Sequence, residues 1–303
     1  KHQNILSLKG FEKAYKEITS WDGYQITPLA SLDDLAKETH VNTLHYKDEY
    51  YRFALKSFKA LGGAYAVANL LLEHLDKLGF QVNSNDLFQK KHQNITSKIT
   101  VCCATDGNHG KSVAWGAQLF GCQCEIFIHT HVSEVREKEI AKYGAVVHRI
   151  HGNYDDSVRI ASQIANEKKY FIVSDTSYEG YTRVPKDVMQ GYTIMVKEAL
   201  EQMKEKPTHI FLQGGVGGMA AAVASFVLET YENNPPILIV VEPNNADCLL
   251  QSARNGKPTA VHGDLETIMA GLSCGEISIL AWEILEKKVS AFVSIEDEPI
   301  VET

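Results

Sequence analysis

The clearest strand–loop–helix signal in the chain is Ile99-Thr-Val-Cys-Cys-Ala104-Thr-Asp-Gly-Asn-His-Gly110. Its first half is an apolar run of strand length, and a polar, glycine-containing loop then leads into an amphipathic segment. A buried strand followed directly by a helix is the building unit of a parallel α/β sheet. We therefore expect a strand at 99–104, a helix at 108–120, and a ligand-binding loop between them, because ligands bind at the carboxyl ends of such strands.

The same alternation continues along the chain. Further strands are expected at 124–129, 145–150, 171–174, 209–212 and 237–242, with helices at 133–143, 155–168 and 185–202. Strands that alternate with helices favour right-handed βαβ units. The sequence therefore predicts an α/β protein with doubly wound, mostly parallel sheets.

The first third of the chain has a different pattern. It predicts helices at 11–18, at 29–38 with Ser31 as N-cap, and at 60–77 ending at Gly79, and a strand at 43–48. The polar segment 84–97 predicts a mobile connection.

Composition narrows the function classes. The 303 residues are 44% hydrophobic and 22% charged, as in ordinary globular proteins, with a formal net charge of −8. This acidic balance argues against nucleic acid and anionic membranes as partners. No apolar run reaches the roughly 20 residues of a membrane span, and the N-terminus has no signal-peptide pattern. We therefore expect a cytoplasmic protein.

Six cysteines show neither CxxC pairs nor histidines at zinc-ligand spacing, so no metal site is expected. Buried thiols in a reducing compartment are the simplest interpretation. A disulfide between Cys248 and Cys274 is left open, because both lie in one loop-rich region.

A lysine with reactive character lies in Arg52-Phe-Ala-Leu-Lys-Ser-Phe-Lys59-Ala-Leu-Gly-Gly-Ala-Tyr65. Apolar neighbours remove water from the Lys59 ammonium, which is expected to lower its pKa and free a nucleophilic amine. Such a lysine can hold a cofactor aldehyde as a Schiff base. On this stretch alone, a surface lysine of an amphipathic helix remains the alternative.

Residues 104–110 are a candidate anion site, because backbone N–H groups at a helix N-terminus bind carboxylate or phosphate. The Asn108 amide can also bind a phenolic oxygen of a ligand. The alternative is a plain βα turn capped by Asp106, which would need fewer polar residues and glycines. His109 and His148 are interpreted from the residues alone as structural histidines.

Gln213-Gly-Gly-Val-Gly-Gly218 follows another strand and opens another helix. Glycines there let backbone amides face a phosphate without a Cβ in the way. The spacing Gly215-x-Gly217-x-x-Ala220, with a strand that ends at Glu242, also fits a dinucleotide-binding fingerprint. NAD binding is therefore an alternative.

A further polar cluster, Ser174-Asp-Thr-Ser-Tyr-Glu-Gly180-Tyr181, lies at a strand end. Asp175 is a candidate second carboxylate of the site, and a solvated loop acid is the alternative.

The lysine, the asparagine loop and the glycine loop, in this order, resemble fold-type II pyridoxal-phosphate enzymes, the tryptophan synthase β group. More narrowly, the chain is similar to the diaminopropionate ammonia-lyase family. The stretches that carry the resemblance are Tyr46-Lys-Asp-Glu-x-x-Arg52-Phe, Phe58-Lys-Ala-Leu-Gly-Gly63, 104–110 with Val113-Ala-Trp115, Asn153-Tyr-Asp-Asp156, Asp175-Thr-x-x-Glu-Gly-Tyr181, Met189-Gln-Gly-Tyr192, Val241-Glu-Pro-x-x-Ala-Asp-Cys248 and Ile268-Met-Ala-Gly-Leu-x-Cys-Gly275-Glu.

The resemblance implies a fold, a cofactor and a set of site residues. The fold is a large domain of residues 1–60 and 185–303 with a smaller inserted domain of residues 61–184, whose edge carries the asparagine loop. Lys59 would form the Schiff base with pyridoxal 5'-phosphate and remove the α-proton. The other implied cofactor contacts are Phe58, Asn108, Gly214, Gly215, Val216, Gly217 and Gly218. The implied substrate contacts are Thr105, Asp106, Gly107 and His109, and Asp175 would be catalytic.

The implied reaction is α,β-elimination of 2,3-diaminopropionate to pyruvate and ammonia by a homodimer. Asp106 replaces the small residue of serine and threonine dehydratases. Its carboxylate can pair with the second substrate ammonium, and a hydroxyl substrate would leave it unpaired. Asp106 would also act as base for the D isomer.

Besides NAD binding, two further alternatives remain at this point. One is another fold-type II enzyme, such as a serine/threonine dehydratase. The other is an inactive truncated fragment, because chains of this family are longer. Their C-terminal part carries a Ser-Gly-Glu-Ser-Gly-type segment and the hydroxyl residue that contacts the pyridine nitrogen.

Overall fold

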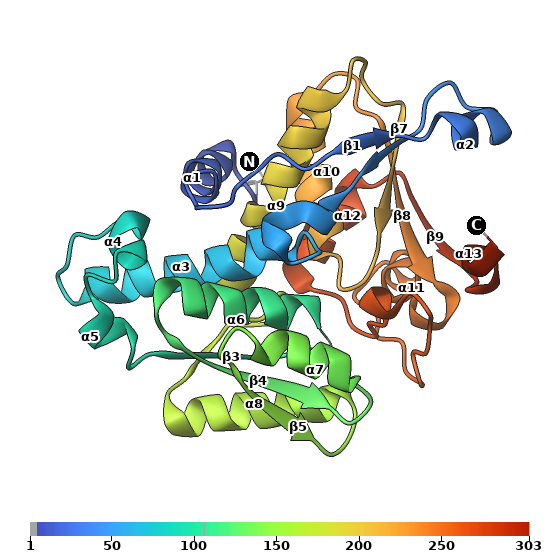
Figure 1. Ribbon diagram of the computed structural model, residues 1–303. Coiled ribbons are helices and arrows are strands. Elements are labelled where there is room, and N and C mark those ends of the chain that lie inside the picture. The colour runs from blue at the N-terminus through green and yellow to red at the C-terminus, as the bar shows by residue number, and fades with distance from the viewer. Residues whose placement is uncertain (1–4, 106, 303) are drawn as a thin grey trace.

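The computed structural model describes residues 5–105 and 107–302. A first parallel sheet has the strand order β5-β4-β3-β6. Its strands are β3 (Thr100–Ala104), β4 (Gln123–His129), β5 (Val146–Ile150) and β6 (Phe171–Ile172). Figure 1 shows α6 (Asn108–Phe120) and α7 (Glu134–Ala141) on one face of this sheet and α8 (Tyr154–Lys168) on the other. The four strands and three helices predicted for this region are confirmed.

A second parallel sheet has the order β7-β8-β9. It consists of β7 (His209–Gln213), β8 (Ile237–Pro243) and β9 (Ala291–Ile295). The helices α9 (Arg183–Gln202), α10 (Gly218–Thr230) and α12 (Ile279–Lys288) pack against one another beside it, and α11 (Cys248–Asn255) contacts β9. The last elements are the short helices η2 (Asn244–Ala246), η3 (Ala270–Leu272) and α13 (Glu298–Glu302). Parallel sheets covered by helices confirm the predicted α/β class, whereas β9 was not predicted.

Helix α3 (Lys59–Lys77) lies at the centre and packs against both α6 and α9. Glycines and alanines on α3 bring the helices close together. A Cβ on Gly62 would lie 2.4 Å from Cε1 of Tyr192, and Gly116 of α6 packs directly on Ala64. The helix is therefore buried along most of its length, with its first residue, Lys59, between the two sheets.

The N-terminal segment corrects one prediction. Residues 29–38 are not one helix: β1 (Leu29–Ser31) pairs antiparallel with β2 (His45–Lys47), and α2 (Asp33–Glu38) begins only afterwards. Ser31 belongs to the strand, and its hydroxyl bonds the Asp33 side chain. The predicted cap was wrong because pairing with a distant strand overrides the local capping signal.

The segment 84–97 was also predicted wrongly. It contains α4 (Ser84–Phe88) and α5 (Gln93–Thr96). Asn83 and Asp86 form a reciprocal capping box at the start of α4, and Leu87 is buried. The polar composition of this segment therefore reflects helix capping.

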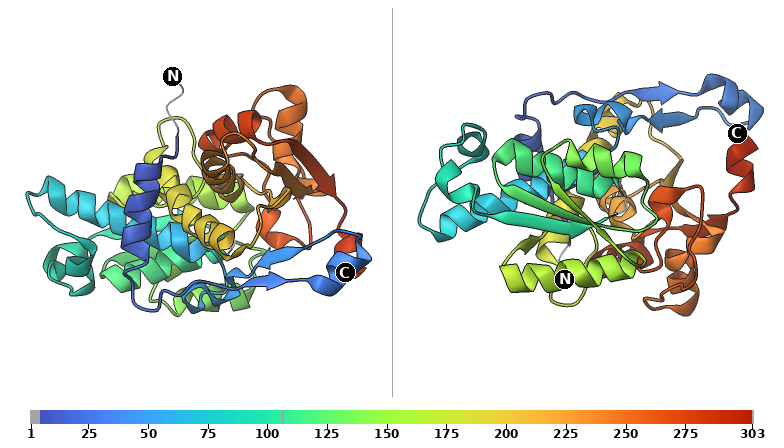
Figure 2. Two further views of the ribbon diagram at one scale, coloured as in Figure 1. Left: turned by 90° about the horizontal axis from the view of Figure 1, so that it is seen from above. Right: turned by 60° about the horizontal axis from the view of Figure 1, so that its bottom comes forward.

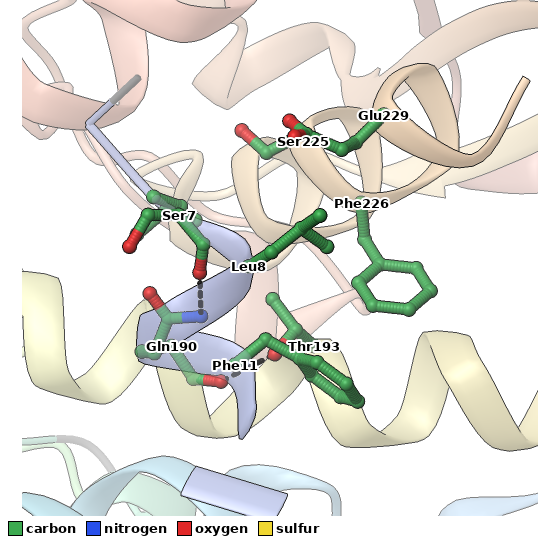
Figure 3. A pocket seen from close by; sticks show the side chains of 9 residues that line it. Ser7, Leu8, Phe11, Gln190, Thr193, Ser225, Phe226 and Glu229 are labelled. Atoms are coloured by element: carbon green, nitrogen blue, oxygen red, sulfur yellow. Dashed lines mark hydrogen bonds between the residues drawn. The ribbon is translucent and has the colours of Figure 1, made fainter. Parts of the chain in front are cut away.

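Helix α1 (Leu8–Ile18) lies across α9, as the left view of Figure 2 shows. Gln190 of α9 donates a 3.4 Å hydrogen bond to the Ser7 carbonyl, and Phe11 packs edge-on against Phe226. Figure 3 shows the small cavity at this contact. Its volume of about 10 Å³ holds no more than one water, and no predicted site residue lines it.

The two sheets lie on either side of the expected domain boundaries, within 61–184 and 185–303 respectively. The boundaries themselves stay a prediction. Within the described ranges, no helix combines the length and the apolar character needed to cross a bilayer.

Candidate active site

Lys59 is held by an unusual turn. The helix η1 (Glu49–Ala54) precedes it, and Phe53, Ala54 and Lys56 have left-handed backbone angles with φ of 48°, 57° and 60°. Such angles cost free energy in non-glycine residues and persist only where the surroundings enforce them. The Lys59 N–H donates to Ser57 Oγ at 3.1 Å. The turn thus directs the lysine away from the helix axis of α3 toward the loop that follows β6.

Asp175 from that loop is the direct partner of Lys59. The lysine Nζ donates to Asp175 Oδ2 at 2.6 Å, and the two side chains are 24% and 17% exposed. Burial alone would lower the pKa of Lys59, but the Asp175 carboxylate overrides it and raises the pKa well above the ordinary value. Burial alone would likewise raise the pKa of Asp175, but His109 and Lys59 hold it well below its usual range.

This pair corrects the prediction of a lysine with a lowered pKa. The apolar neighbours are present, but a carboxylate distant in sequence reverses their effect. The alternative of a solvated surface lysine is also wrong, because the Lys59 side chain is only 24% exposed and its ammonium lies beside the paired rings of Phe58 and Tyr192. Its distances to the two ring centroids are 5.4 and 5.7 Å.

His109 contributes a second polar group beside Asp175. Its Nε2 lies 2.8 Å from the Val173 carbonyl oxygen, and its Nδ1 lies 3.8 Å from Asp175 Oδ2. Burial lowers the pKa of His109, although the Asp175 carboxylate acts in the opposite direction. Within the described ranges, the buried Nδ1 has no hydrogen-bond partner.

The asparagine loop begins at the end of β3. Thr105 Oγ1 accepts hydrogen bonds of 3.2 Å from the N–H groups of Gly107 and Gly110, which closes the turn. A Cβ on Gly110 would lie 2.3 Å from Thr105 Cγ2, so the turn requires this glycine. Asn108 is the exposed first residue of α6. Asp106 lies outside the described residues.

The glycine loop connects β7 to α10. Gly217 has φ +95°, a backbone conformation that favours glycine. Within residues 5–105 and 107–302, the N–H groups of Gly215, Val216, Gly217 and Gly218 donate to no acceptor. The Gly214 N–H does, to the Val241 carbonyl at 2.7 Å. Gly214 therefore serves the loop by lacking a Cβ, which would lie 2.7 Å from Glu242 Cγ.

Asp175 lies next to both the glycine loop and Lys59. A Cβ on Gly218 would lie 3.8 Å from the Asp175 carbonyl oxygen, while the carboxylate of the same residue bonds Lys59. Cys274 faces both parts as well, because it lies beside Gly215 and acts electrostatically on Lys59. The predicted lysine, second carboxylate and glycine loop thus lie at one place.

Two buried serines that sequence reasoning missed fasten the Asp175 loop. The Ser177 N–H donates to Ser278 Oγ at 3.0 Å, and Ser177 Oγ accepts from the Leu280 N–H at 2.8 Å, capping α12. The Ser278 N–H in turn donates to the Val216 carbonyl of the glycine loop at 2.9 Å. Sequence reasoning also did not assign Tyr192 to the site, because no local pattern links it to Lys59. The residue appeared only as part of a matching stretch.

The position of Glu242 excludes the dinucleotide site considered above, in which this carboxylate would bind the ribose. Its side chain is fully buried and accepts 2.8 Å hydrogen bonds from the N–H groups of Leu249 and Leu250. It caps α11 beneath the glycine loop and cannot reach a ribose. Cys248 and Cys274 are not joined in the structure, so the disulfide left open by the sequence is not formed.

Comparisons with known proteins agree with this site. A family model described as "Pyridoxal-phosphate dependent enzyme" matches residues 21–303. Diaminopropionate ammonia-lyase of Escherichia coli (strain K12) is 43% identical, over 91% of this chain and 69% of the relative. The enzyme of Salmonella typhimurium is 41% identical, over 90% of this chain and 69% of its own length. The crystal structure of the Escherichia coli enzyme in complex with D-serine superposes with a TM-score of 0.89 at 38% identity, covering 98% of this chain and 74% of that one.

Proposed function

Because the chain belongs to the pyridoxal-phosphate dependent enzymes, we propose that it catalyses α,β-elimination of 2,3-diaminopropionate to pyruvate and ammonia. The observation that carries the proposal is the contact of 2.6 Å between Lys59 Nζ and Asp175 Oδ2, in a site that the glycine loop borders. It brings together an amine and a carboxylate, two groups that removal of an α-proton from an amino acid would use. Identities of 41% and 43% to two diaminopropionate ammonia-lyases support the choice of substrate.

The residues present fit the cofactor. Four N–H groups of the glycine loop have no acceptor in the described part of the chain, and three of them belong to glycines. They suit a phosphate at the N-terminus of α10. Lys59 offers an amine to an aldehyde, and Phe58 lies beside it. The buried His109 Nδ1 and Tyr192 hydroxyl are polar atoms that still need partners. When bound, pyridoxal phosphate supplies an aldehyde that captures amino groups and a ring that withdraws electrons from the α-carbon.

Lys59 and Asp175 have different roles in the proposed proton transfer. The neutral Lys59 amine accepts the α-proton of the L isomer, and the resulting ammonium is stabilised by Asp175. Because the carboxylate raises the pKa of the lysine, the amine is a strong proton acceptor once it is neutral. The serine pair Ser177 and Ser278 holds the Asp175 loop against the glycine loop during this exchange.

The substrate contacts are proposed from the sequence. Asp106 would pair with the second ammonium of the substrate and accept the α-proton of the D isomer. Asn108 would bind the phenolic oxygen of the cofactor from the start of α6. Thr105, Gly107 and His109 complete the loop, and the buried hydrogen bonds of Thr105 support a rigid shape for it.

Further features belong to the same proposal. We expect a homodimer in the cytoplasm, with a large domain of residues 1–60 and 185–303 and an inserted domain of residues 61–184. The described part of the chain has no disulfide among its six cysteines, which is in keeping with a reducing compartment. Light scattering on a size-exclusion column distinguishes the dimer from a monomer.

The decisive experiment combines chemistry and mapping. Borohydride reduction of the purified protein followed by peptide mass mapping should place a pyridoxyl group on Lys59. Release of ammonia and of the 2-oxo acid (pyruvate from diaminopropionate or serine, 2-oxobutanoate from threonine) is then measured with D- and L-diaminopropionate, serine and threonine. An adduct at another residue, or none, contradicts the assignment of Lys59. Faster turnover of serine or threonine would instead favour a dehydratase.

A further inference from the structure

Tyr192 of α9 has a buried hydroxyl group without a partner. The residue is 1% exposed, and within residues 5–105 and 107–302 no group meets its hydroxyl with good hydrogen-bond geometry, although Lys59 lies close enough to act on the pKa of the phenol. A buried polar group left in this condition costs free energy, so native proteins usually provide a partner in at least one functional state. We therefore ask which group becomes the hydrogen-bond partner of the Tyr192 hydroxyl when the protein functions.

The surroundings of Tyr192 point to Lys59. The ring packs against the backbone of Gly62, where a Cβ would lie 2.4 Å from Cε1, and it meets the Phe58 ring edge-on at 4.9 Å. Lys59 Nζ lies 5.7 Å from the centroid of the Tyr192 ring. Burial raises the pKa of the Tyr192 phenol, so the hydroxyl keeps its proton and is a hydrogen-bond donor.

The Lys59 nitrogen needs different partners in its two protonation states. As an ammonium it only donates, and Asp175 is the matching acceptor at 2.6 Å. As a neutral amine it also carries a lone pair, which an ionised carboxylate cannot satisfy. A phenolic O–H can satisfy it.

Few other groups could donate a hydrogen bond to the neutral Lys59 amine. The titratable groups that act on Lys59 from the neighbouring elements are Asp175, Tyr192 and Cys274. His109 faces Asp175, with its Nδ1 3.8 Å from the carboxylate oxygen. Cys274 is a weaker hydrogen-bond donor than a phenol. Among these groups Tyr192 is therefore the strongest hydrogen-bond donor.

We propose that the Tyr192 hydroxyl donates a hydrogen bond to Lys59 Nζ whenever that nitrogen is uncharged, so that Asp175 and Tyr192 alternate as its partners. Tyr192 is then a catalytic residue, because it contacts a reacting atom. The inference rests on the proposed function, in which Lys59 must be neutral to capture an aldehyde and to accept an α-proton. It adds a residue that stabilises this neutral state.

Tyr192→Phe removes only the hydroxyl and tests the proposal. In the holoenzyme, the visible absorbance of the lysine–cofactor linkage is titrated with pH. Without the donor, the midpoint should move up by about 0.3 to 1 pH unit, which corresponds to a two- to tenfold change in the uncharged fraction. The kcat should fall by a similar factor while KM changes little.

A second measurement does not depend on the cofactor. After removal of cofactor with hydroxylamine, acylation of Lys59 by limiting acetic anhydride is followed over a range of pH by peptide mass mapping. The midpoint of this pH profile should lie about 0.3 to 1 pH unit higher in the variant, because the donor that stabilises the neutral amine is absent. Its melting temperature should equal or exceed that of wild type, because an unpaired buried hydroxyl has been removed.

Tyr24→Phe is the matched control, since the Tyr24 hydroxyl donates to Glu198 Oε1 at 2.8 Å away from the lysine. It should lower the melting temperature and leave Lys59 acylation unchanged. Equal midpoints of Lys59 acylation in wild type and Tyr192→Phe overturn the role of Tyr192, whether or not cofactor binds. A wild-type protein without a pyridoxyl adduct on Lys59 instead overturns the proposed function, and the two failures are thereby distinguished.

Discussion

Ser112 Oγ donates a 2.7 Å hydrogen bond to the carbonyl oxygen of Lys59 and accepts one of 3.1 Å from the Ala64 N–H. One fully buried hydroxyl thus fastens α6 to the first turns of α3. The contact is possible because Gly63 lacks a side chain: its Cβ would lie 2.5 Å from Ser112 Oγ. Ser112 lies one helical turn after Asn108, so it fixes the asparagine loop relative to the lysine.

Ser112→Ala should therefore affect both folding and activity. Loss of the hydroxyl removes two buried hydrogen bonds to α3, which should lower the free energy of unfolding by about 1 to 3 kcal/mol. Misplacement of Lys59 relative to Asn108 should lower kcat by about ten- to a hundredfold. Urea unfolding and steady-state kinetics measure the two effects. Ser157→Ala, at an equally buried serine of α8, is the control and should leave kcat unchanged.

Asp175→Asn should change the protonation of Lys59. The carboxylate raises the pKa of Lys59 against the effect of burial, so its removal leaves burial dominant and lowers that pKa. Lys59 should then react with acetic anhydride at lower pH than in wild type. Turnover should fall by about a hundredfold or more, since proton transfer by a positioned group contributes that much. A variant whose Lys59 titrates like wild type would contradict the assigned role of Asp175.

Arg52 should be among the most stabilising side chains of the fold. Its guanidinium is fully buried and bonds Glu49 at 2.8 Å and Glu198 at 2.7 Å, while Lys47 also reaches Glu198. Arg52→Met leaves buried carboxylates without their partner and should cost about 3 to 5 kcal/mol of unfolding free energy. Chemical denaturation measures the loss. Arg159→Met, which breaks an exposed pair with Asp156, should cost less than about 1 kcal/mol.

Local sequence patterns predicted the first sheet well, because its strands are short apolar runs bounded by turns. The helix 108–120 agrees with the structure at both ends. The strand β9 was missed because Ala291–Ile295 is stabilised by pairing with β8, which comes much earlier in the chain. The same limit applies to the site. The lysine and the two loops were visible as motifs, but the pKa of Lys59 depends on Asp175, and the place of Tyr192 depends on helix packing.

Gly215→Ala and Gly217→Ala each add one methyl group to the glycine loop, but their effects should differ. A Cβ on Gly215 meets no atom closer than the 3.4 Å contact with Cys274 Sγ, so Gly215→Ala should fold with nearly wild-type stability. Its methyl group should crowd the N–H groups assigned to the phosphate and weaken pyridoxal phosphate binding about tenfold or more. Gly217→Ala should instead lose about 1 to 2 kcal/mol of unfolding free energy, because φ there is +95°. Absorbance titration with the cofactor and urea unfolding separate the two effects.

Glu242 should make stability depend on pH near neutrality. Burial raises the pKa of its carboxyl group to about 7, although the N–H groups of Leu249 and Leu250 act in the opposite direction. A carboxyl whose folded pKa exceeds its unfolded value stabilises the fold while it is protonated. Its contribution is complete below the ordinary value of 4.5 and is lost as the pH rises toward 7.

Glu242→Gln removes this titration and leaves the other groups in place. The unfolding free energy of wild type minus that of the variant should therefore fall by about 2 to 3 kcal/mol between pH 5 and 8. Urea denaturation at several pH values measures the difference, in which the titrations common to both proteins cancel. The loss of one N–H acceptor in the variant shifts the whole curve but not its slope. Parallel curves for the two proteins would show that Glu242 is already ionised at pH 5 and that its two N–H donors outweigh its burial.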